Sequence, residues 1–569
     1  MLMEKTAYSW PTPSALDAKT QAFPELTADQ MGRIHSVGKV RKVVPGEILF
    51  APDDTNISFF VLLSGGMEIV QPDWSGQERQ ITTHGPGAFT GEITMISGQR
   101  CLVRGRVTEA GEFLEVKSHD FRALVARDAE LSDIFMRAFI LRRMLLITHN
   151  MGNVVLLGSR HSANTLRVRE FLTRNAHPYT YIDLDTDSAA QAFLDRFNVK
   201  LTDVPVVVCN ARNVLRNPTT QQLADCLGFS ANIDNTQVRD VIIVGAGPSG
   251  LAAAVYAASE GLDALVVETE SPGGQAGSSS KIENYLGFPM GVSGQELSNR
   301  ALAQAQKFGA KMMIGHGVVS LECSRRPYQI VLDNREKLSA RSIIISTGAQ
   351  YNKPQIENLK QFEGRGVYYG ATFIESQLCE DADVVVVGGA NSAGQAAVFL
   401  SQTARKVHLL VRRNGLCDTM SRYLIQRISE NPAIELHCNT EITALEGDGD
   451  GQLRSVTWVH RPTGQKSTHD ICHVFMMTGA SPRTEWLHGC VALDNKGFIL
   501  TGRDLEDGNV GPSSPTWSLH SRAPLMLETS LPGVFAVGDV RSGNVKRVAS
   551  AVGEGAIAVH LVHRALAEI

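Results

Sequence analysis

The sequence has no pair of cysteines at the spacing of a redox dithiol. Its nine cysteines include no C-x-x-C pair, and their number is odd; they stand at 101, 209, 226, 323, 379, 417, 438, 472 and 490. We therefore expect neither a disulfide framework nor a zinc site built from clustered cysteines. The 16 histidines show neither H-E-x-x-H nor H-x-x-E-H spacing, so the sequence predicts no metal.

Long hydrophobic runs and an excess of one charge are also missing. Apolar stretches are broken by Gly, Asp or Glu before they could span a bilayer. The first residues, MLMEKTAYSWPTPS, lack the order of a secretory signal. Lys and Arg number 54 against 59 Asp and Glu. The sequence therefore has no excess of positive charge that would favour binding to nucleic acid. We expect a cytoplasmic chain that binds neither membrane nor nucleic acid.

The length of 569 residues exceeds what one hydrophobic core supports, so several domains are expected. Residues 20–130 alternate polar and apolar positions in short stretches such as Ile57–Leu63, Met67–Gln71 and Gly111–Val116. This pattern predicts a small β-barrel or sandwich. Apolar residues at helical spacing then predict a helix over Leu131–Ile147. The helix packs on its own domain or, alternatively, forms a contact with another domain or chain.

Residues 153–229 alternate between strand and helix patterns. Their expected elements are strand Val154–Leu157, helix Thr165–Asn175, strand Tyr179–Leu184, helix Ser188–Phe197 and strand Val206–Val208. The polar stretch Ser230–Gln237 reads as a linker. From Asp240 onward, two long βαβ patterns with Gly-rich turns predict doubly wound sheets.

The first of these patterns carries a dinucleotide-binding fingerprint. The apolar strand Val241–Val244 leads into Gly245-Ala-Gly247-Pro248-Ser249-Gly250 and an Ala-rich helix. The first glycine permits a tight turn, the second a close pyrophosphate, and the third close packing of helix on strand. Glu268 ends the next strand, about 20 residues on, where an acid accepts hydrogen bonds from ribose hydroxyls.

A second fingerprint follows strand Asp383–Val387. It reads Gly388-Gly-Ala390-Asn391-Ser392-Ala393-Gly394, and Ala390 in place of the middle glycine loosens the phosphate contact slightly. The next strand ends without an acid and is followed by Arg412 and Arg413. Arginines there can pair with a 2′-phosphate, which favours NADPH over NAD; the alternative is two solvated arginines.

Residues 238–569 resemble the thioredoxin reductase family. The resemblance lies in Gly273-Gly274-Gln275-Ala, in Ile282–Pro289, in Ser346-Thr347-Gly348-Ala and in Gly533–Val540. It implies that FAD is bound by residues at the family's contact positions, here Gly274, Gln275, Asn284, Thr347, Gly348, Asp539, Arg547 and Val548. The family's R-Q-A reads Arg547-Val548-Ala549, so its Gln is absent. The family also implies a homodimer.

The redox dithiol of that family is missing. Its two cysteine positions fall on Gly370 and Phe373, and Cys379 lies several residues too late. A thiolate must attack and a second sulfur must resolve in dithiol chemistry. We therefore expect that this chain cannot reduce thioredoxin by the family route, and the sequence identifies no catalytic residue.

Three motifs stand at Pro45-Gly-Glu-Ile-Leu-Phe50, at the strand Val61–Ile69 and at Gly91-Glu92-Ile-Thr-Met-Ile-Ser-Gly98. Through them residues 46–116 resemble a cyclic-nucleotide-binding domain. In that family a Gly-Glu pair, here Gly91 and Glu92, opens the phosphate cassette, and an arginine about ten residues later holds the cyclic phosphate. The usual Pro-Arg-Ala-Ala is absent, and Arg100 or Arg104 takes that role. A docking module without ligand is the alternative.

The middle region resembles the thioredoxin or glutaredoxin fold. Asp203-Val-Pro205 suits the family's cis-proline turn, and the active C-x-x-C aligns with Ser162-Ala-Asn-Thr165. Because a hydroxyl has too high a pKa for thiol exchange, we expect this domain not to carry electrons.

Together these patterns predict an N-terminal β-barrel, an α/β thioredoxin-like domain and two doubly wound α/β domains. The expected limits are 20–150, 151–230, 238–351 with 481–569 for FAD, and 352–480 for NADPH. The leading hypothesis is an NADPH-dependent FAD oxidoreductase that serves a non-disulfide acceptor, either a small molecule such as a quinone, free flavin or oxygen, or a ferredoxin-like protein. The N-terminal domain is the candidate regulator of this activity. The alternatives are a thioredoxin-disulfide reductase regulated by a cyclic nucleotide and a non-enzymatic redox or second-messenger sensor.

Overall fold

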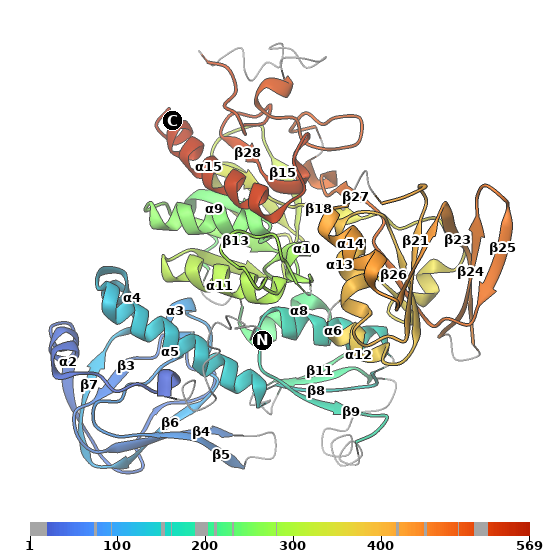
Figure 1. Cartoon of the computed structure of the whole chain (residues 1–569). Coiled ribbons are helices and arrows are strands. Elements are labelled where there is room, and N and C mark those ends of the chain that lie inside the picture. The colour runs from blue at the N-terminus through green and yellow to red at the C-terminus, as the bar shows by residue number, and fades with distance from the viewer. Residues whose placement is uncertain are drawn as a thin grey trace, which may run out of the picture. The chain divides into compact units, whose positions relative to one another are not determined.

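A computed structural model shows two compact units (Figure 1). One contains residues 1–156, 177–181 and 207–214, and the other contains 157–176, 182–206 and 215–569. The structure describes residues 20–72, 77–92, 94–149, 154–160, 162–187, 203–209, 213–229, 233–279, 281–371, 373–416, 420–448, 452–487, 489–505 and 522–568. In these ranges no helix is both long and apolar enough to cross a membrane.

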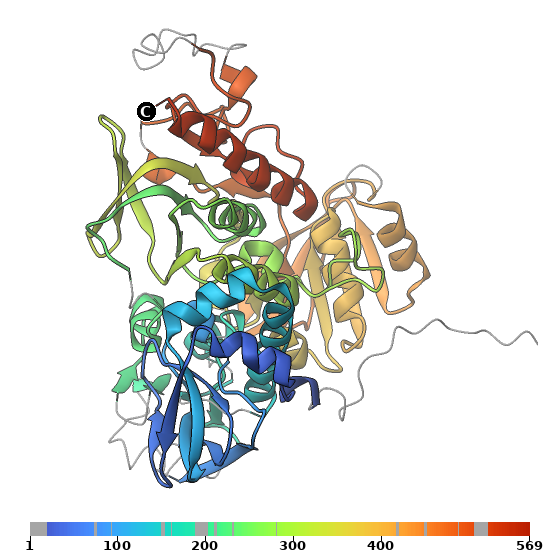
Figure 2. The same cartoon turned by 90° about the vertical axis from the view of Figure 1, so that its left-hand side faces the viewer.

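The N-terminal domain is a pair of antiparallel sheets, as the alternating pattern predicts (Figure 2). The sheets have the strand orders β1-β7-β3 and β2-β6-β4-β5. Their strands are β1 (Lys39–Val43), β2 (Ile48–Phe50), β3 (Phe59–Leu62), β4 (Gly66–Pro72), β5 (Glu78–His84), β6 (Arg104–Glu109) and β7 (Gly111–Val116). The helices are α2 (Ala28–His35), α3 (Thr94–Ser97), α4 (Ser118–Arg127) and α5 (Ala129–Thr148).

Helix α5 packs on its own domain, which confirms the first of the two interpretations. Phe135 and Phe139 are fully buried against Phe59, Phe89 and Phe121. Offset and edge-to-face pairs of this kind add stability beyond the buried area. The helix also buries two arginines, which the sequence pattern does not predict.

The middle region forms a four-stranded sheet with the order β11-β10-β8-β9, and the division between the two units passes through it. Its elements are β8 (Val154–Gly158), α6 (Ala163–Arg174), β9 (Thr180–Asp183), β10 (Val206–Cys209), β11 (Asn213–Arg216) and α8 (Thr220–Leu227). The Val204–Pro205 bond is cis, as expected. The helix expected at 188–197 lies outside the described residues.

The first doubly wound domain has a six-stranded sheet path, β14-β13-β12-β17-β16-β15, to which β28 adds beside β17. The strands are β12 (Val238–Val244), β13 (Ala264–Glu268), β14 (Lys311–Ile314), β15 (Val318–Glu322), β16 (Tyr328–Leu332), β17 (Lys337–Ile345) and β28 (Val534–Ala536). The main helices are α9 (Pro248–Ser259), α11 (Gly294–Lys307) and α15 (Val548–Leu566). Because β28 runs parallel to β17, the C-terminal segment completes a sheet that begins about residue 238.

Helices α9 and α15 lie against each other because α15 presents a glycine at their contact. A Cβ added at Gly555 would stand 2.2 Å from the carbonyl oxygen of Ser249. Small residues at such positions let two helix backbones approach closely. The position of α15 over the glycine turn before α9 thus depends on Gly555.

The second doubly wound domain contains a parallel sheet with the order β19-β26-β20-β21-β22. Its strands are β19 (Val367–Tyr368), β20 (Asp383–Val387), β21 (Lys406–Val411), β22 (Ile434–Cys438) and β26 (His473–Met476), and its helices are α12 (Phe373–Leu378), α13 (Asn391–Leu400) and α14 (Arg422–Glu430). A second sheet, β23-β24-β25, comprises Thr440–Gly447, Leu453–His460 and Gln465–His469. The connecting strands β18 (Ala349–Tyr351) and β27 (Ala480–Pro482) pair with each other.

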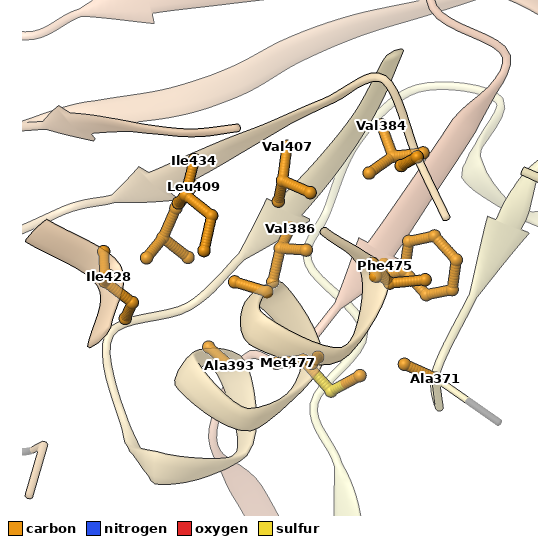
Figure 3. Packing of buried hydrophobic residues seen from close by; sticks show 14 of the residues in the cluster. Ala371, Val384, Val386, Ala393, Val407, Leu409, Ile428, Ile434, Phe475 and Met477 are labelled. Carbon is orange, nitrogen blue, oxygen red and sulfur yellow. The ribbon is translucent and has the colours of Figure 1, made fainter. Parts of the chain in front are cut away.

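Alternate residues of this sheet face opposite layers. Val384, Val386, Val407 and Leu409 point toward α13, whose Ala393 lies in the same cluster (Figure 3). The residues between them, such as Val385 and Leu410, pack against strands β23 and β24. The residues of β21 and β22 that point to the same face as Val385 and Leu410 therefore lie between the two sheets.

The expectation of no disulfide is wrong. Cys323 and Cys490 are bonded, with their Cα atoms 5.9 Å apart and a separation of 167 positions in sequence. The cysteine spacing gives no sign of this pair, because only the return of the C-terminal segment to the first doubly wound domain brings Cys490 beside the end of β15.

We predict that Gly555→Ala destabilises the first doubly wound domain, since the new methyl group would strike the Ser249 backbone. Overpacking of this kind costs about 1–3 kcal/mol. Gly553→Ala is the matched control, because a Cβ there meets nothing within 4 Å and alanine favours the helix by ~1 kcal/mol. Thermal unfolding, monitored through the release of bound flavin, should show a lower midpoint temperature for Gly555→Ala and not for Gly553→Ala. Equal midpoints would contradict the proposed contact.

Candidate cofactor and redox site

The turn after β12 is shaped by backbone contacts that only glycine permits. Gly245 has φ +103°, and a Cβ there would stand 2.4 Å from the Ser346 carbonyl oxygen. A Cβ at Gly250 would stand 1.9 Å from the carbonyl oxygen of Gly245. A Cβ at Gly247 would meet nothing within 4 Å, and Pro248 opens α9 directly after it. The positive end of α9 therefore faces open space, which fits a pyrophosphate.

Glu268 is held at the end of β13 by the backbone. Its carboxylate accepts hydrogen bonds from Ala246 N at 2.7 Å and from Glu270 N at 3.0 Å. Burial raises the pKa of this carboxyl, and the two hydrogen bonds oppose that rise. Because a carboxylate has about four lone-pair sites, it can still accept ribose hydroxyls.

Three further predicted FAD contacts lie around the neighbouring strand end. Gln275, in α10 (Gly274–Gly277), donates to the carbonyl of Ala349. Thr347 Oγ1 donates to the Arg483 carbonyl at 2.9 Å, and Gly348 has φ +64° with open space at its Cβ position. Asn284 is exposed.

Asp539 lies in η5 (Gly538–Val540), beside a glutamate that the sequence analysis does not identify. Burial raises the pKa of Asp539. Glu554 accepts hydrogen bonds from Gly538 N at 2.7 Å and from Arg541 at 2.5 Å, and so fixes the turn that carries Asp539. Glu554 could have been identified as the one acidic residue of the helix Val548–Leu566. Arg547 and Val548 begin that helix, α15.

The second glycine turn repeats the plan of the first. Gly388 has φ +148°, and a Cβ there would stand 2.4 Å from the Met477 carbonyl oxygen. Ala390 is the N-cap of α13, Asn391 Oδ1 accepts a hydrogen bond from Ser421 N at 2.7 Å, and Ala393 is fully buried. Beyond the end of β21, Arg412 and Arg413 are exposed.

A cleft of about 30 Å³ brings residues of both doubly wound domains together. It is lined by Gln275, Ser278, Ser279, Tyr369, Gly370, Ala371, Ser392, Gln395, Ala396 and Met477. A Cβ at Gly370 would meet only the Ser278 side chain, at 3.7 Å. The first position of the missing dithiol therefore faces the cleft. Phe373 begins α12, and its side chain lies outside the described part of the structure.

The described free cysteines are Cys101, Cys379, Cys438 and Cys472. Cys379, the one that follows the dithiol positions, is fully buried and donates its thiol to the Glu375 carbonyl at 3.1 Å. Burial raises its pKa to about 12, so it is protonated at neutral pH and a poor nucleophile. Cys417 lies outside the described residues.

The candidate cyclic-nucleotide residues of the N-terminal domain have partners within that domain. Glu92 is buried and lies 3.4 Å from Arg143 of α5, while Arg142 donates to the Gly91 carbonyl at 2.7 Å. Burial lowers the pKa of Arg142 to about 9. Arg104 is paired with Glu78. Arg100 lies 4.0 Å from Asp53.

Comparison with known proteins assigns the C-terminal part of the chain to a protein family. Residues 239–555 match the family described as pyridine nucleotide-disulphide oxidoreductase. The chain belongs to this family. Residues 40–128 match the cyclic nucleotide-binding domain.

The relatives are thioredoxin reductases. The chain is 30% identical to that of Bacillus subtilis over 58% of its own length and 96% of the relative, and 34% identical to that of Mycolicibacterium smegmatis over 58% and 97%. It is 31% identical to NADPH-dependent thioredoxin reductase 3 of Arabidopsis thaliana over 62% of its own length but only 65% of the relative. The solved structure of Lactococcus lactis thioredoxin reductase covers 58% of this chain and 100% of its own, at 27% identity and a TM-score of 0.51.

FAD and NADPH are the cofactors of this family. The residues of this member fit both groups. Each glycine turn leads into a helix N-terminus, the first turn has open space at Gly247, and Arg412 and Arg413 after β21 are exposed cations of the kind that pair with a phosphate.

We predict that iodoacetamide at pH 8 leaves Cys379 unmodified in the folded protein. With a pKa of about 12, roughly one thiol in 10⁴ is ionised at that pH. The rate should rise as the pH approaches the pKa. Exposed Cys472 is the internal reference, and peptide mapping by mass spectrometry measures both. Stoichiometric labelling of Cys379 at pH 8 would show that it is a reactive thiol.

Proposed function

We propose that this chain is an NADPH-dependent flavoprotein reductase whose electron acceptor is not a protein disulfide. The observation that carries the proposal is the replacement of both dithiol positions, one by Gly370 in the cleft and one by Phe373. When bound, FAD would accept a hydride from NADPH and give up two electrons to the acceptor. The resemblance to the family also supports a homodimer.

The residues proposed to bind FAD act by position and charge. The turn at Gly245, Gly247 and Gly250 would place the pyrophosphate at the start of α9, where backbone N–H groups point outward. Glu268 would accept from the ribose, and Asp539, steadied by Glu554 through Gly538, would accept from the ribityl chain. Gln275, Asn284, Thr347 and Gly348 complete the proposed site, with Arg547 and Val548 at the start of α15.

The proposed NADPH site starts at the Gly388 turn. Ala390 and Asn391 would place the pyrophosphate at the N-terminus of α13. Arg412 and Arg413 are exposed at the end of β21 and would pair with the 2′-phosphate, which NADH lacks. Ser392, in the same helix as Asn391, lines the cleft together with Gln275 of the proposed flavin site.

A disulfide acceptor would need a thiolate close to the flavin and a second sulfur to resolve it. Cys379 offers a single buried thiol of raised pKa. In the middle region, which we propose is thioredoxin-like, Ser162 is the N-cap of α6 and its hydroxyl accepts from Thr165 N at 3.5 Å. A serine there caps a helix and does not exchange disulfides. A quinone, free flavin, oxygen or a ferredoxin-like protein needs no such sulfur.

We expect NADPH to bleach the flavin band of the purified protein in an anaerobic titration. Arg412→Ala should raise the NADPH concentration for half-reduction about tenfold or more, since a charge-assisted contact is worth ~1.5–3 kcal/mol, and should leave the NADH value unchanged. Gln402→Ala, a change on the same domain away from the proposed site, is the control.

The reoxidation step separates the three functions. A quinone should restore the flavin band, whereas oxidised thioredoxin should leave it bleached. Restoration by thioredoxin that Cys379→Ser abolishes would establish the disulfide reductase. Binding of NADPH without bleaching would establish the sensor.

For the N-terminal domain we infer a role that needs no cyclic nucleotide at Glu92. The Glu92 and Arg143 side chains are both more than nine-tenths buried and form an ion pair inside the domain. Removing one partner of such a pair leaves an uncompensated buried charge, which is costly. The candidate phosphate ligand Arg104 is engaged by Glu78. The arginines of α5 thus already hold the segment that a cyclic nucleotide would have to contact.

Calorimetric titration of the full chain with cAMP and with cGMP should show no saturable heat. The physical reason is burial: Glu92 is 6% exposed and its carboxylate is ion-paired with Arg143 inside the domain, so a ribose hydroxyl could reach it only by disturbing a buried ion pair. Saturable binding in the wild type that Arg104→Ala abolishes would contradict this inference and establish a cyclic-nucleotide-regulated enzyme.

A further inference from the structure

Three metal-ligating side chains gather in the second doubly wound domain, on strands β21 and β22. They are His408, Glu435 and His437, and their ligand atoms all lie within 4.8 Å of one another. We propose that these residues bind one divalent transition-metal ion, Zn²⁺ by preference, and leave a fourth position for water. This site is separate from the proposed flavin and NADPH sites, and it replaces the expectation that the chain holds no metal.

The cluster follows from the register of two parallel strands. His408 pairs with Glu435 across β21 and β22, and His437 pairs with Leu410. Because alternate residues of a strand point to the same face, Glu435 and His437 share one face of the sheet. That face is the one on which Leu410 packs toward the sheet β23-β24-β25. The three side chains therefore converge at the edge of the space between two sheets.

The distances suit a small metal ion. His408 Nδ1 lies 3.0 Å from His437 Nε2, and His437 Nε2 lies 3.5 Å from Glu435 Oε1. His408 Nδ1 is 3.9 Å from the other carboxylate oxygen. Tetrahedral zinc with ligands at 2.0–2.1 Å separates them by about 3.3 Å. A rotation of the half-exposed Glu435 carboxylate is needed to place all three on one ion, because its oxygen nearer to His437 is not the one nearer to His408.

The donor set selects the class of metal. Two imidazoles and one carboxylate form a set used by zinc, and also by other divalent first-row ions. The two ring nitrogens at 3.0 Å cannot both carry a proton, so at least one lone pair already faces the other ring. Ca²⁺ and Mg²⁺ prefer oxygen ligands and are disfavoured here.

Aromatic side chains from the neighbouring sheet cover the cluster. The Trp458 ring lies 5.5 Å from that of His408 and 5.6 Å from that of His437, and it stacks on His469 at 3.8 Å. His469 is itself held by Ser467 at 2.9 Å. Such packing fixes the orientation of the imidazoles, as an outer shell does in metal sites.

Exposure of the cluster increases from one ligand to the next. His408 is 8% exposed, whereas the side chains of His437 and Glu435 are 21% and 44% exposed. This gradient gives an ion a path from solvent and leaves room for a bound water. Lys406 pairs with Glu435 through Oε2, so Oε1, the oxygen nearer His437, is the one proposed to bind the metal.

Calorimetry of the chelator-treated full chain, with FAD bound, tests the site directly. We expect Zn²⁺ to bind at one site per chain, and Co²⁺ to give the visible bands of a tetrahedral ion without thiolate charge transfer. His437→Gln and Glu435→Gln should each weaken binding at least ~100-fold, because loss of an outer-shell partner alone costs about 10–100-fold. Glu435 is half-exposed, so its variant should fold even if the other fails.

Two control variants exclude other metal ligands. His460→Gln changes a histidine of the neighbouring sheet that bonds Thr463, and Cys438→Ser removes the thiol next to His437. Both should bind Zn²⁺ like the wild type. Absence of a saturable site, or binding that the Glu435 variant leaves unchanged, would overturn the proposal. The flavin titration with NADPH is independent of this measurement, so the two proposals can fail separately.

Discussion

Close approach of one backbone segment to another is the constraint on which the cofactor half of this protein depends. At Gly245, Gly250 and Gly388, carbonyl oxygens occupy the space that a side chain would need. These contacts bring a strand end, a turn and a helix N-terminus to one place, with amide groups directed at open space. The proposed positions of both pyrophosphates depend on this geometry.

The sequence predicts well those features that depend on residues close together in the chain. The two fingerprints and the flanking strands lie where the pattern places them, because a strand, a turn and a helix within thirty residues obey local rules. The barrel strands follow for the same reason. The structure adds contacts between distant segments. Cys490 meets Cys323, Glu554 reaches Gly538, and His408 meets His437 only after the sheets have formed.

Two groups of side chains lie where the sequence pattern does not predict them, each for a physical reason. Arginines within an apolar helix pattern normally face solvent. Arg142 and Arg143 of α5 are buried instead, because backbone carbonyl groups accept hydrogen bonds from Arg142 and the Glu92 carboxylate pairs with Arg143. Similarly, histidines without motif spacing can still form a cluster, since parallel strands align residues that are 27 or 29 positions apart. Spacing rules detect sites built on one helix or loop and miss those built across a sheet.

The pairing of β17 with β28 also has a consequence for synthesis on the ribosome. Ser342 donates a hydrogen bond to the Gly533 carbonyl, 191 residues further along the chain. Until residues 534–536 emerge, the second half of β17, Ile343–Ile345, has one unpaired edge, whereas its first half already pairs with β16. Exposed edges of this kind promote aggregation. The second doubly wound domain is complete by then and can fold first. The sheet of the first doubly wound domain is therefore expected to close only after residues 534–536 have been synthesised.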